Sequence, residues 1–316
     1  MQHSAKLAGA LFCALLTMSG LAEAKLRLGV LPAADSIVLY TAQDKGLFRE
    51  AGLDVEIIPF KSALEIGAAM RANQLDGHFG DLMNVLSQNA RGVPQAVVLT
   101  TTHTSAAQRN FAMVTSPQAA NDIKGLADLK GTDTAMSSST IIDYLLDRMA
   151  QEAKLPDGAL KRVEVKQIPI RLQMLLSGQT STALLPEPLV SVVQAKGGRV
   201  IWDDRQLDET QAVVALKKSE LTPDNIKGLR SAVAKAAKLI ESDPDTYRAV
   251  MVEKGLLPKP VASHYTMLRF SLFKTADGLP PLPSAEEVKR VGDWMLSHKM
   301  LDTLPRYEDV VVPAQP

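Results

Sequence analysis

Cysteine is nearly absent from the 316-residue sequence, and the only one, Cys13, falls within an N-terminal segment that has the composition of an export signal. The mature chain would then contain no thiol, which excludes disulfides, thiolate metal sites and cysteine nucleophiles. Aromatic residues make up only 4% of the chain, which argues against a sugar-stacking groove or a base-stacking platform. Lys+Arg and Asp+Glu both number 35, so no net charge draws the protein to nucleic acid or to an anionic membrane.

Residues 1–24 have the three parts of a removable signal peptide. A positive charge is followed by an apolar core and by Ala-Glu-Ala, which predicts cleavage after Ala24. The core is too short to anchor the chain stably across a bilayer, although an uncleaved anchor helix is the alternative. A lipid anchor would require a small residue before Cys13, where Phe12 stands. We therefore predict an exported, periplasmic (extracytoplasmic) protein that is not lipid-anchored.

The rest of the chain alternates short apolar strands with amphipathic helices. Strands are expected at 25–31, 55–60, 78–79 and 95–101, with helices at 37–45, 63–73 and from 82 to about 91. A second set of strands is expected at 111–115, 132–136, 163–168, 182–185 and 200–202, with helices at 141–154, 171–176 and 189–196. A strand at 211–216 and helices at 224–241, 244–254 and 284–297 follow, and residues 310–316 are expected to form a tail. The alternation predicts an α/β fold with largely parallel sheets covered by helices.

Two polar segments, at 100–109 and 203–210, interrupt this alternation. They predict a discontinuous lobe I at 25–104 plus 207–316, which includes the C-terminal helices, and a lobe II at 105–206. Two crossings between lobes make a hinge that keeps the lobes in register while they close on a ligand. The alternative is a rigid protein with two sub-domains.

Two stretches of the sequence, 70–83 and 174–189, look like copies of one another. Each contains an apolar helix end, a glutamine, a short apolar strand, an acid and the start of a new helix. The acids are Asp81 and Glu187. Ligands of open α/β sheets bind beyond the carboxyl ends of the strands, so we predict both acids at the lips of a cleft between two similar lobes. Chance similarity is the alternative, because acidic caps after apolar strands are common.

Residues 31–56 contain Leu-Pro-Ala-Ala-Asp-Ser, Lys-Gly-Leu-Phe and Gly-Leu-Asp-Val-Glu, and residues 176–188 read Leu-Ser-Gly-Gln-Thr-Ser-Thr-Ala-Leu-Leu-Pro-Glu-Pro. With these motifs the chain resembles the substrate-binding proteins of nitrate/sulfonate/taurine-type ABC importers, a family that also binds pyrimidine precursors of thiamine. The acid that usually follows the glutamine is replaced here by Thr180 or Ser181. The resemblance covers residues 25–202 well and the C-terminal helices in outline.

The resemblance implies a type II periplasmic binding protein, with two α/β lobes joined by a two-strand hinge and a cleft between them. It also implies that a monomer captures a small solute without chemistry and delivers it to an ABC permease and ATPase. No two histidines have the spacing of a metal site, and no local motif supplies a Ser/His/Asp triad. We therefore expect no catalytic residue, no metal and no cofactor.

The candidate ligand-binding residues lie where the predicted strands end. They are Asp35, Ser36, Tyr40, Gly80, Asp81, Thr101, Thr102, His103, Ser137, Ser138, Ser139, Thr140 and Glu187. The loop 137–140, which the family uses for ligand contact, would offer free backbone N–H groups and hydroxyls to an anion. The alternative for each acid is a helix cap, and the alternative for His103 is a surface position. We expect Arg109 and Arg171 to face solvent rather than the cleft.

Three acids around the predicted opening, with no obvious base, favour a guest that carries amino or ring N–H groups. An aminopyrimidine would satisfy them, as would a taurine-like zwitterion with its acidic end at 137–140. An enzyme of the same fold that acts on a pyrimidine or menaquinone precursor is the runner-up, although the pyrimidine-synthase type carries a cysteine-rich iron motif that this sequence lacks. A sensor domain would need a membrane-spanning and a cytoplasmic segment.

Overall fold

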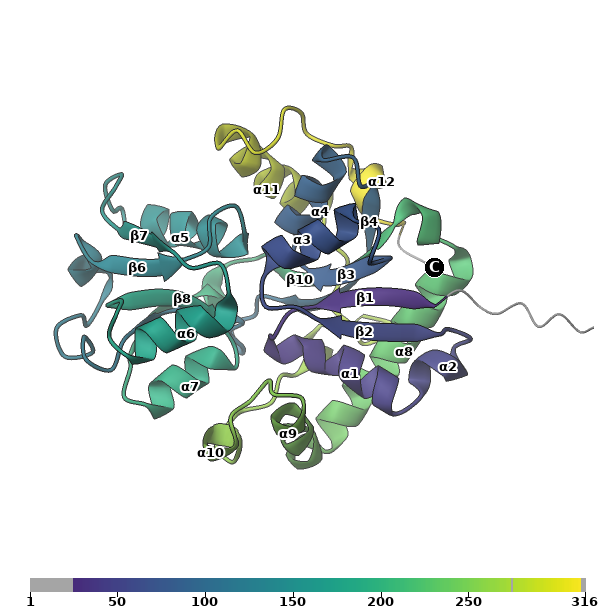
Figure 1. Ribbon diagram of the computed structural model, residues 1–316, viewed down its shortest axis with the longest axis horizontal. Coiled ribbons are helices and arrows are strands. Elements are labelled where there is room, and N and C mark those ends of the chain that lie inside the picture. The colour runs from purple at the N-terminus through teal and green to yellow at the C-terminus, as the bar shows by residue number, and fades with distance from the viewer. Residues whose placement is uncertain (1–24, 274, 314–316) are drawn as a thin grey trace, which may run out of the picture.

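The computed structural model describes residues 25–273 and 275–313, so the predicted signal peptide lies outside the described residues. The chain forms two α/β lobes, each built on a five-stranded sheet (Figure 1). The sheet of lobe I contains β1 (Leu26–Val30), β2 (Val55–Pro59), β3 (Gly77–Gly80), β4 (Gln95–His103) and β10 (Thr210–Lys217). The sheet of lobe II contains β5 (Phe111–Thr115), β6 (Asp133–Met136), β7 (Lys161–Glu164), β8 (Thr182–Pro186) and β9 (Val200–Asp203).

The two sheets have the same topology. The strand order is β2-β1-β3-β10-β4 in lobe I and β7-β6-β8-β5-β9 in lobe II. The first three strands of each order pair in parallel, and the fourth is antiparallel to both of its neighbours. That fourth strand is β5 where the chain enters lobe II and β10 where it returns to lobe I. Each of the two connections between the lobes therefore leads into the antiparallel strand that lies between the third and fifth strands of its sheet. We call β5 and β10 the inserted strands.

The repeated sequence pattern corresponds to a repeated structural unit. β3 and β8 are the third strands of their sheets, and each pairs with the inserted antiparallel strand. Asp81 follows β3 and precedes α4 (Leu82–Ala90), whereas Glu187 follows β8 and precedes α7 (Leu189–Ala195). The two acids thus occupy equivalent positions in the two lobes.

Helices cover both faces of each sheet (Figure 1). In lobe I, one face carries α1 (Ile37–Asp44), α2 (Leu47–Glu50) and α8 (Pro223–Ser242), and the other carries α3 (Ala63–Arg71), α4, α11 (Ala285–Ser297) and α12 (Tyr307–Val310). In lobe II, α6 (Ile168–Leu176) and α7 cover one face and α5 (Ile141–Glu152) covers the other. Helices α9 (Pro244–Glu253) and α10 (Lys259–Ala262) lead from α8 toward α7. Among the described residues, no helix combines the length and the apolar character needed to cross a bilayer.

The alternation of side chains along the strands separates the core into layers. In β10, Val214 and Leu216 belong to the cluster beneath α1 and α8, whereas Val213 and Ala215 belong to the cluster beneath α4 and α11. The second cluster continues through α4 into lobe II, where it includes Ile142 and other residues of α5. The lobes therefore meet through packed apolar side chains.

Three local features differ from the sequence prediction. Residues 310–316 do not form a free tail throughout, because Val310–Val312 are buried and Val312 N donates to Val97 O at 3.0 Å. This segment adds to β4, the edge strand of its sheet. Helix α6 begins at Ile168 rather than at residue 171, since its Pro169 is tolerated in a first helical turn. The strand expected at 163–168 is instead β7 at Lys161–Glu164, and residue 168 already belongs to α6.

Candidate ligand-binding site between the lobes

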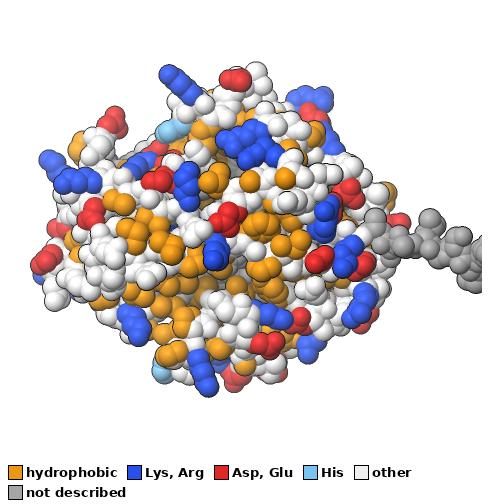
Figure 2. Space-filling model, in the orientation of Figure 1, with side chains coloured by type: hydrophobic (Ala, Val, Ile, Leu, Met, Phe, Trp, Pro, Cys, Tyr) orange, Lys and Arg blue, Asp and Glu red, His pale blue; other side chains and the backbone are white. Residues whose placement is uncertain are grey.

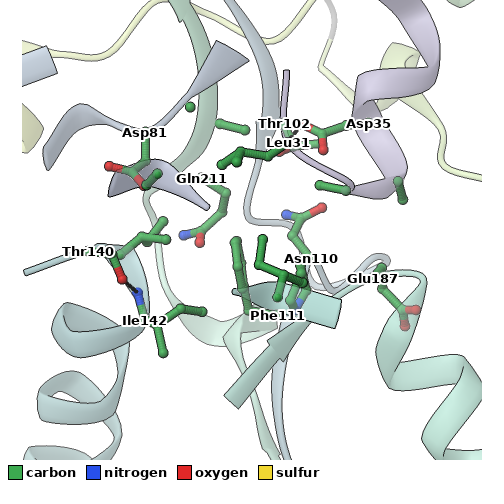
Figure 3. Close-up of a pocket in the computed structure, with 18 of the residues that line it drawn as sticks. Leu31, Asp35, Asp81, Thr102, Asn110, Phe111, Thr140, Ile142, Glu187 and Gln211 are labelled. Atoms are coloured by element: carbon green, nitrogen blue, oxygen red, sulfur yellow. Dashed lines mark hydrogen bonds between the residues drawn. The ribbon is translucent and has the colours of Figure 1, made fainter. Parts of the chain in front are cut away.

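A cavity of about 70 Å³ lies between the two lobes (Figure 3). Its lobe I wall follows the carboxyl ends of β1 and β3, and its lobe II wall follows those of β6 and β8. This is the edge at which open α/β sheets bind ligands. The two inserted strands close the cavity, because Asn110 and Phe111 lie at the start of β5 and Gln211 and Ala212 lie in β10. The apolar lining includes Leu31, Phe79, Phe111, Ile142 and Leu268.

Asp35 lies in the cavity wall, within the short 3-10 turn Ala34–Ser36 that precedes α1. Its Oδ2 accepts hydrogen bonds from the hydroxyls of Thr101 at 2.5 Å and Thr102 at 3.1 Å, at the end of β4. Burial raises the pKa of Asp35 to about 6, and the two hydroxyls oppose this rise in part. The Asp35 side chain makes no hydrogen bond to the N-terminus of a helix. The alternative that Asp35 serves as a helix cap is therefore wrong.

Asp81 both caps a helix and lines the cavity. Its Oδ1 accepts from Asn84 N at 2.8 Å, at the start of α4. Burial raises the pKa of Asp81 to about 6, against the effect of the backbone N–H groups of Asn84, Ile141 and Met83. Ile141 begins α5 in lobe II, so the carboxyl group approaches the positive end of a helix in the opposite lobe.

The Glu187 carboxylate accepts hydrogen bonds from residues of its own lobe. Its Oε1 accepts from Arg109 Nε at 2.6 Å, and its Oε2 accepts from Ser191 N and Oγ at 3.2 and 2.9 Å. Figure 3 shows the carboxylate turned away from the centre of the cavity. Arg109 does not line the cavity, in agreement with the prediction, but it does not simply face solvent either, because its guanidinium holds this buried acid and its side chain is only 22% exposed. The backbone of Glu187 still links the lobes, since its carbonyl accepts from Ala34 N at 2.8 Å.

The loop 137–140 precedes α5, as predicted, but two of its backbone N–H groups are not free. Ser138 N donates to Glu164 Oε2 at 3.0 Å, and Ser139 N donates to Asp143 Oδ2 at 3.0 Å. The protein's own carboxylates therefore engage two of the donors of the expected anion cradle. Of the four residues, Ser137 and Thr140 line the cavity, and Ser138 and Ser139 are exposed beside it.

The structure brings together Asp35, Gly80, Asp81, Thr102, Ser137, Thr140 and Glu187 from the predicted set. Ser36, Tyr40, Thr101 and His103 lie outside the lining. The Ser36 hydroxyl donates to Ala33 O at 2.7 Å, and the Tyr40 ring lies 5.9 Å from Lys254 Nζ. Burial is the largest single influence on His103 and lowers its pKa, but the hydrogen bonds to Glu287 and Thr104 O and the charges of Glu287 and Asp208 together outweigh it, so the net shift of the pKa is upward.

Arg171 is the first functional candidate that the sequence reading missed. Its side chain is 1% exposed and lines the cavity, so the expectation that it faces solvent is wrong. Its guanidinium donates to Val165 O through Nε and Nη2, at 3.2 and 2.9 Å, and to Leu184 O at 3.5 Å. Burial lowers the pKa of Arg171 to about 10, which leaves it charged at neutral pH. With Lys166, it places positive charge on the lobe II side.

Gln211 and Asn110 are the other candidates that were missed. Both side chains are buried, both line the cavity, and both come from the strands that connect the lobes. The signal in the sequence was a glutamine at the start of the apolar run Ala-Val-Val-Ala-Leu. Among the described residues, no group of three or more His, Cys, Asp or Glu side chains is arranged to hold a metal ion.

Comparison with known proteins agrees with this architecture. A family model described as NMT1/THI5-like matches residues 33–247. The periplasmic aliphatic sulphonate binding protein SsuA of Escherichia coli aligns with a TM-score of 0.72 and 18% identity, over 91% of this chain and 97% of that chain. The alkanesulfonate-binding protein SsuA of Xanthomonas axonopodis pv. citri, bound to MOPS, gives 0.71 and 19%, over 92% and 97%. The periplasmic nitrate-binding protein NrtA of Synechocystis PCC 6803 gives 0.63 and 13%, over 84% and 75%. No curated protein sequence matches significantly.

At these identities the solved structures establish the fold alone. They confirm the predicted α/β class and the type II periplasmic binding protein architecture with two lobes. The family model spans more than half of the chain, and it agrees with the motifs in residues 31–56 and 176–188. The chain belongs to the NMT1/THI5-like family.

Proposed function

We propose that the protein captures a small nitrogen-containing or zwitterionic organic solute outside the cytoplasm and delivers it to an ABC permease. The observation that carries this proposal is the cavity, whose walls come from strand ends of both sheets and from both connections. A guest there would contact both lobes at once, so its binding free energy would favour the closed arrangement. The solved relatives, named as sulfonate- and nitrate-binding proteins, support the same role.

Opening and closing of the lobes is part of the proposal. Gln167 Nε2 donates to Glu65 Oε1 at 2.9 Å, and Ile168 N donates to Lys61 O at 3.1 Å, so only a few polar contacts cross this edge of the interface. The cavity of about 70 Å³ is smaller than the roughly 300–1,000 Å³ of typical small-molecule pockets. We infer that the lobes separate when a guest enters.

The charges around the cavity support a guest with nitrogen-bound hydrogen. Asp35 and Asp81 lie on the lobe I side, while Lys166 and Arg171 lie on the lobe II side. Amino or ring N–H groups would pair with the first two, and an acceptor or acidic end would lie toward the second two. This polarity extends the sequence-based reasoning, which found only the acids.

We propose further that the guest is released unchanged. The described lining contains no histidine and no cysteine, and the Thr140 hydroxyl donates to Ser137 O at 2.8 Å instead of facing a general base. These features support a carrier over the alternative, an enzyme of the same fold. The predicted signal peptide supports a periplasmic location for the mature monomer, with the permease and its ATPase as partners.

Calorimetry on residues 25–316, with aminopyrimidines, taurine and ethanesulfonate as probes, tests the proposal. We expect one probe to bind with 1:1 stoichiometry, to remain chemically intact by mass spectrometry, and to stimulate ATP hydrolysis by the permease–ATPase complex in proteoliposomes. Conversion of the probe would contradict the carrier role. Absence of stimulation by the loaded protein would contradict the role in import.

A further inference from the structure

Two carboxamides in the cavity wall have polar atoms without a hydrogen-bond partner among the described residues. These atoms are Oε1 and Nε2 of Gln211 and Oδ1 of Asn110. Gln211 is 1% exposed and Asn110 is 6% exposed. Figure 3 shows both side chains reaching into the space between the lobes. Buried amide groups are nearly always bonded in folded proteins. The carboxamide of Gln95 also has no partner in the described part of the chain but lies away from the cavity, so it is their position in the cavity wall that makes the free atoms of Gln211 and Asn110 available to the polar groups of a guest.

The two residues stand on the strands that join the lobes. Gln211 lies in β10 and Asn110 directly precedes β5, where each connection enters its sheet. A hinge rotation moves the outer parts of each lobe farther than its connecting strands. The two carboxamides therefore form the part of the cavity wall whose geometry changes least between open and closed forms. Such fixed groups are suited to distinguish one guest from another.

Several donors that could bind an anion in or beside the cavity are already engaged by the protein. The N–H groups of Ser138 and Ser139 bind Glu164 and Asp143, and the Arg171 guanidinium donates to backbone carbonyls. An anionic group would also approach two buried carboxyls, Asp35 and Asp81. A sulfonate or nitrate carries no N–H group, so it would leave the carboxamide oxygens unpaired, at a cost in affinity.

We propose that Gln211 and Asn110 are specificity-determining residues that select an uncharged guest with an N–H donor beside an acceptor, as in a lactam or an amide. A primary carboxamide presents one acceptor and its N–H donors in a single plane, which is complementary to such an edge. The Asn110 oxygen accepts a second N–H group, and Phe111 and Ile142 contact the apolar faces. The inference rests on the proposed function and narrows its guest to an uncharged one.

Calorimetry with matched probes tests this selection. Cytosine and 2-pyridone present the donor–acceptor edge, N-methyl-2-pyridone lacks the donor, and ethanesulfonate and nitrate are the anions. We expect the first two to bind at least about 10-fold more tightly than the other three. Gln211→Met should weaken the binding of cytosine and 2-pyridone by about 10- to 100-fold and should leave N-methyl-2-pyridone little changed.

Gln95→Met is the matched control variant, because Gln95 is equally buried in the neighbouring strand β4 but does not line the cavity. It should bind every probe as the wild type does, and the thermal unfolding of both variants shows whether they are folded. Tighter binding of ethanesulfonate or nitrate, or equal effects of the two substitutions, would overturn the selection and leave the carrier role intact. Failure of the wild type to bind any probe would count against both.

Discussion

The indole Nε1 of Trp294 donates a hydrogen bond of 2.9 Å to Oδ2 of Asp147, and so joins α11 to α5 of the other lobe. The same carboxylate oxygen lies 3.1 Å from Nε2 of His298, whose ring stacks on Trp294 at a centroid distance of 4.1 Å. Tyr144 of α5 completes the contact edge-on, at 5.6 Å from Trp294. Helix α11 packs on α4 of lobe I, so this cluster links the lobes outside the cavity lining.

Trp294→Phe should loosen this link, because the variant keeps an aromatic ring against Tyr144 and loses the N–H donor. We expect a loss of about 1 kcal/mol in the free energy of unfolding and a larger radius of gyration by small-angle X-ray scattering. Trp202→Phe is the control, since Trp202 Nε1 donates at 2.8 Å to Glu152 within lobe II. It should lower stability without changing the radius. Equal radii for the two variants would show that the link does not hold the lobes.

Arg109→Met should destabilise the fold, because it leaves the buried Glu187 carboxylate without its cation. Arg109 Nε lies 2.6 Å from Glu187 Oε1, and the Glu187 side chain is only 7% exposed. We expect a loss of about 2 kcal/mol in urea unfolding, below the range for fully buried pairs because the arginine is partly exposed. Adding Glu187→Gln should restore part of the loss. A double variant less stable than Arg109→Met would contradict this account.

The raised pKa of Asp35 predicts how stability depends on pH. The pKa is about 6 in the folded protein and near 3.8 in the unfolded chain, so between pH 4 and 6 the folded protein binds more protons. Stability should therefore fall as pH rises through this window and stay low above it. Asp35→Asn should match the wild type near pH 4 and exceed it by on the order of 2 kcal/mol at pH 7. Urea unfolding at both pH values measures this; a constant difference between the two proteins would contradict it.

Joining the lobes covalently should block exchange of the guest. The Gln167 and Glu65 side chains meet across the interface at 2.9 Å, and the predicted mature chain has no cysteine of its own. We expect Glu65→Cys/Gln167→Cys, treated with a short cleavable bismaleimide, to bind no cytosine by calorimetry until the linker is cut. The single-cysteine variants, treated in the same way, control for modification. Undiminished binding by the cross-linked protein would show that the cavity fills without separation of the lobes.

The order of strands and helices could be predicted from the sequence because most elements carry their own periodicity and several helices, such as α3, α4 and α5, carry their own N-cap. Asp81 and the loop 137–140 follow short apolar strands. Their position beyond the edge of the sheet could therefore be predicted from the sequence. Glu187 was placed correctly at the end of β8, but the direction of its carboxylate was not, because Arg109 lies 78 residues away in the chain. A partner so distant in sequence leaves no local pattern.

Gln211, Asn110 and Arg171 could not be predicted for a related reason. A single glutamine in an apolar strand, or an arginine on a short helix, is compatible with either solvent or core until the register and the neighbouring elements are known. The carbonyl groups that hold Arg171 come from the end of β7 and from β8. The inserted position of β10, between β3 and β4, is what turns Gln211 toward the cavity.

The same insertion limits which parts of the chain can stand alone. Since β10 separates β3 from β4, the two strands have no direct pairing in the completed sheet, and the gap between them is filled by residues 210–217. A nascent or truncated chain that stops short of Lys217 contains β3 and β4 but lacks the complete strand that pairs between them. Lobe II, by contrast, has all of its strands once Asp203 has been made. In order of synthesis, the half that starts second is the first that can be finished.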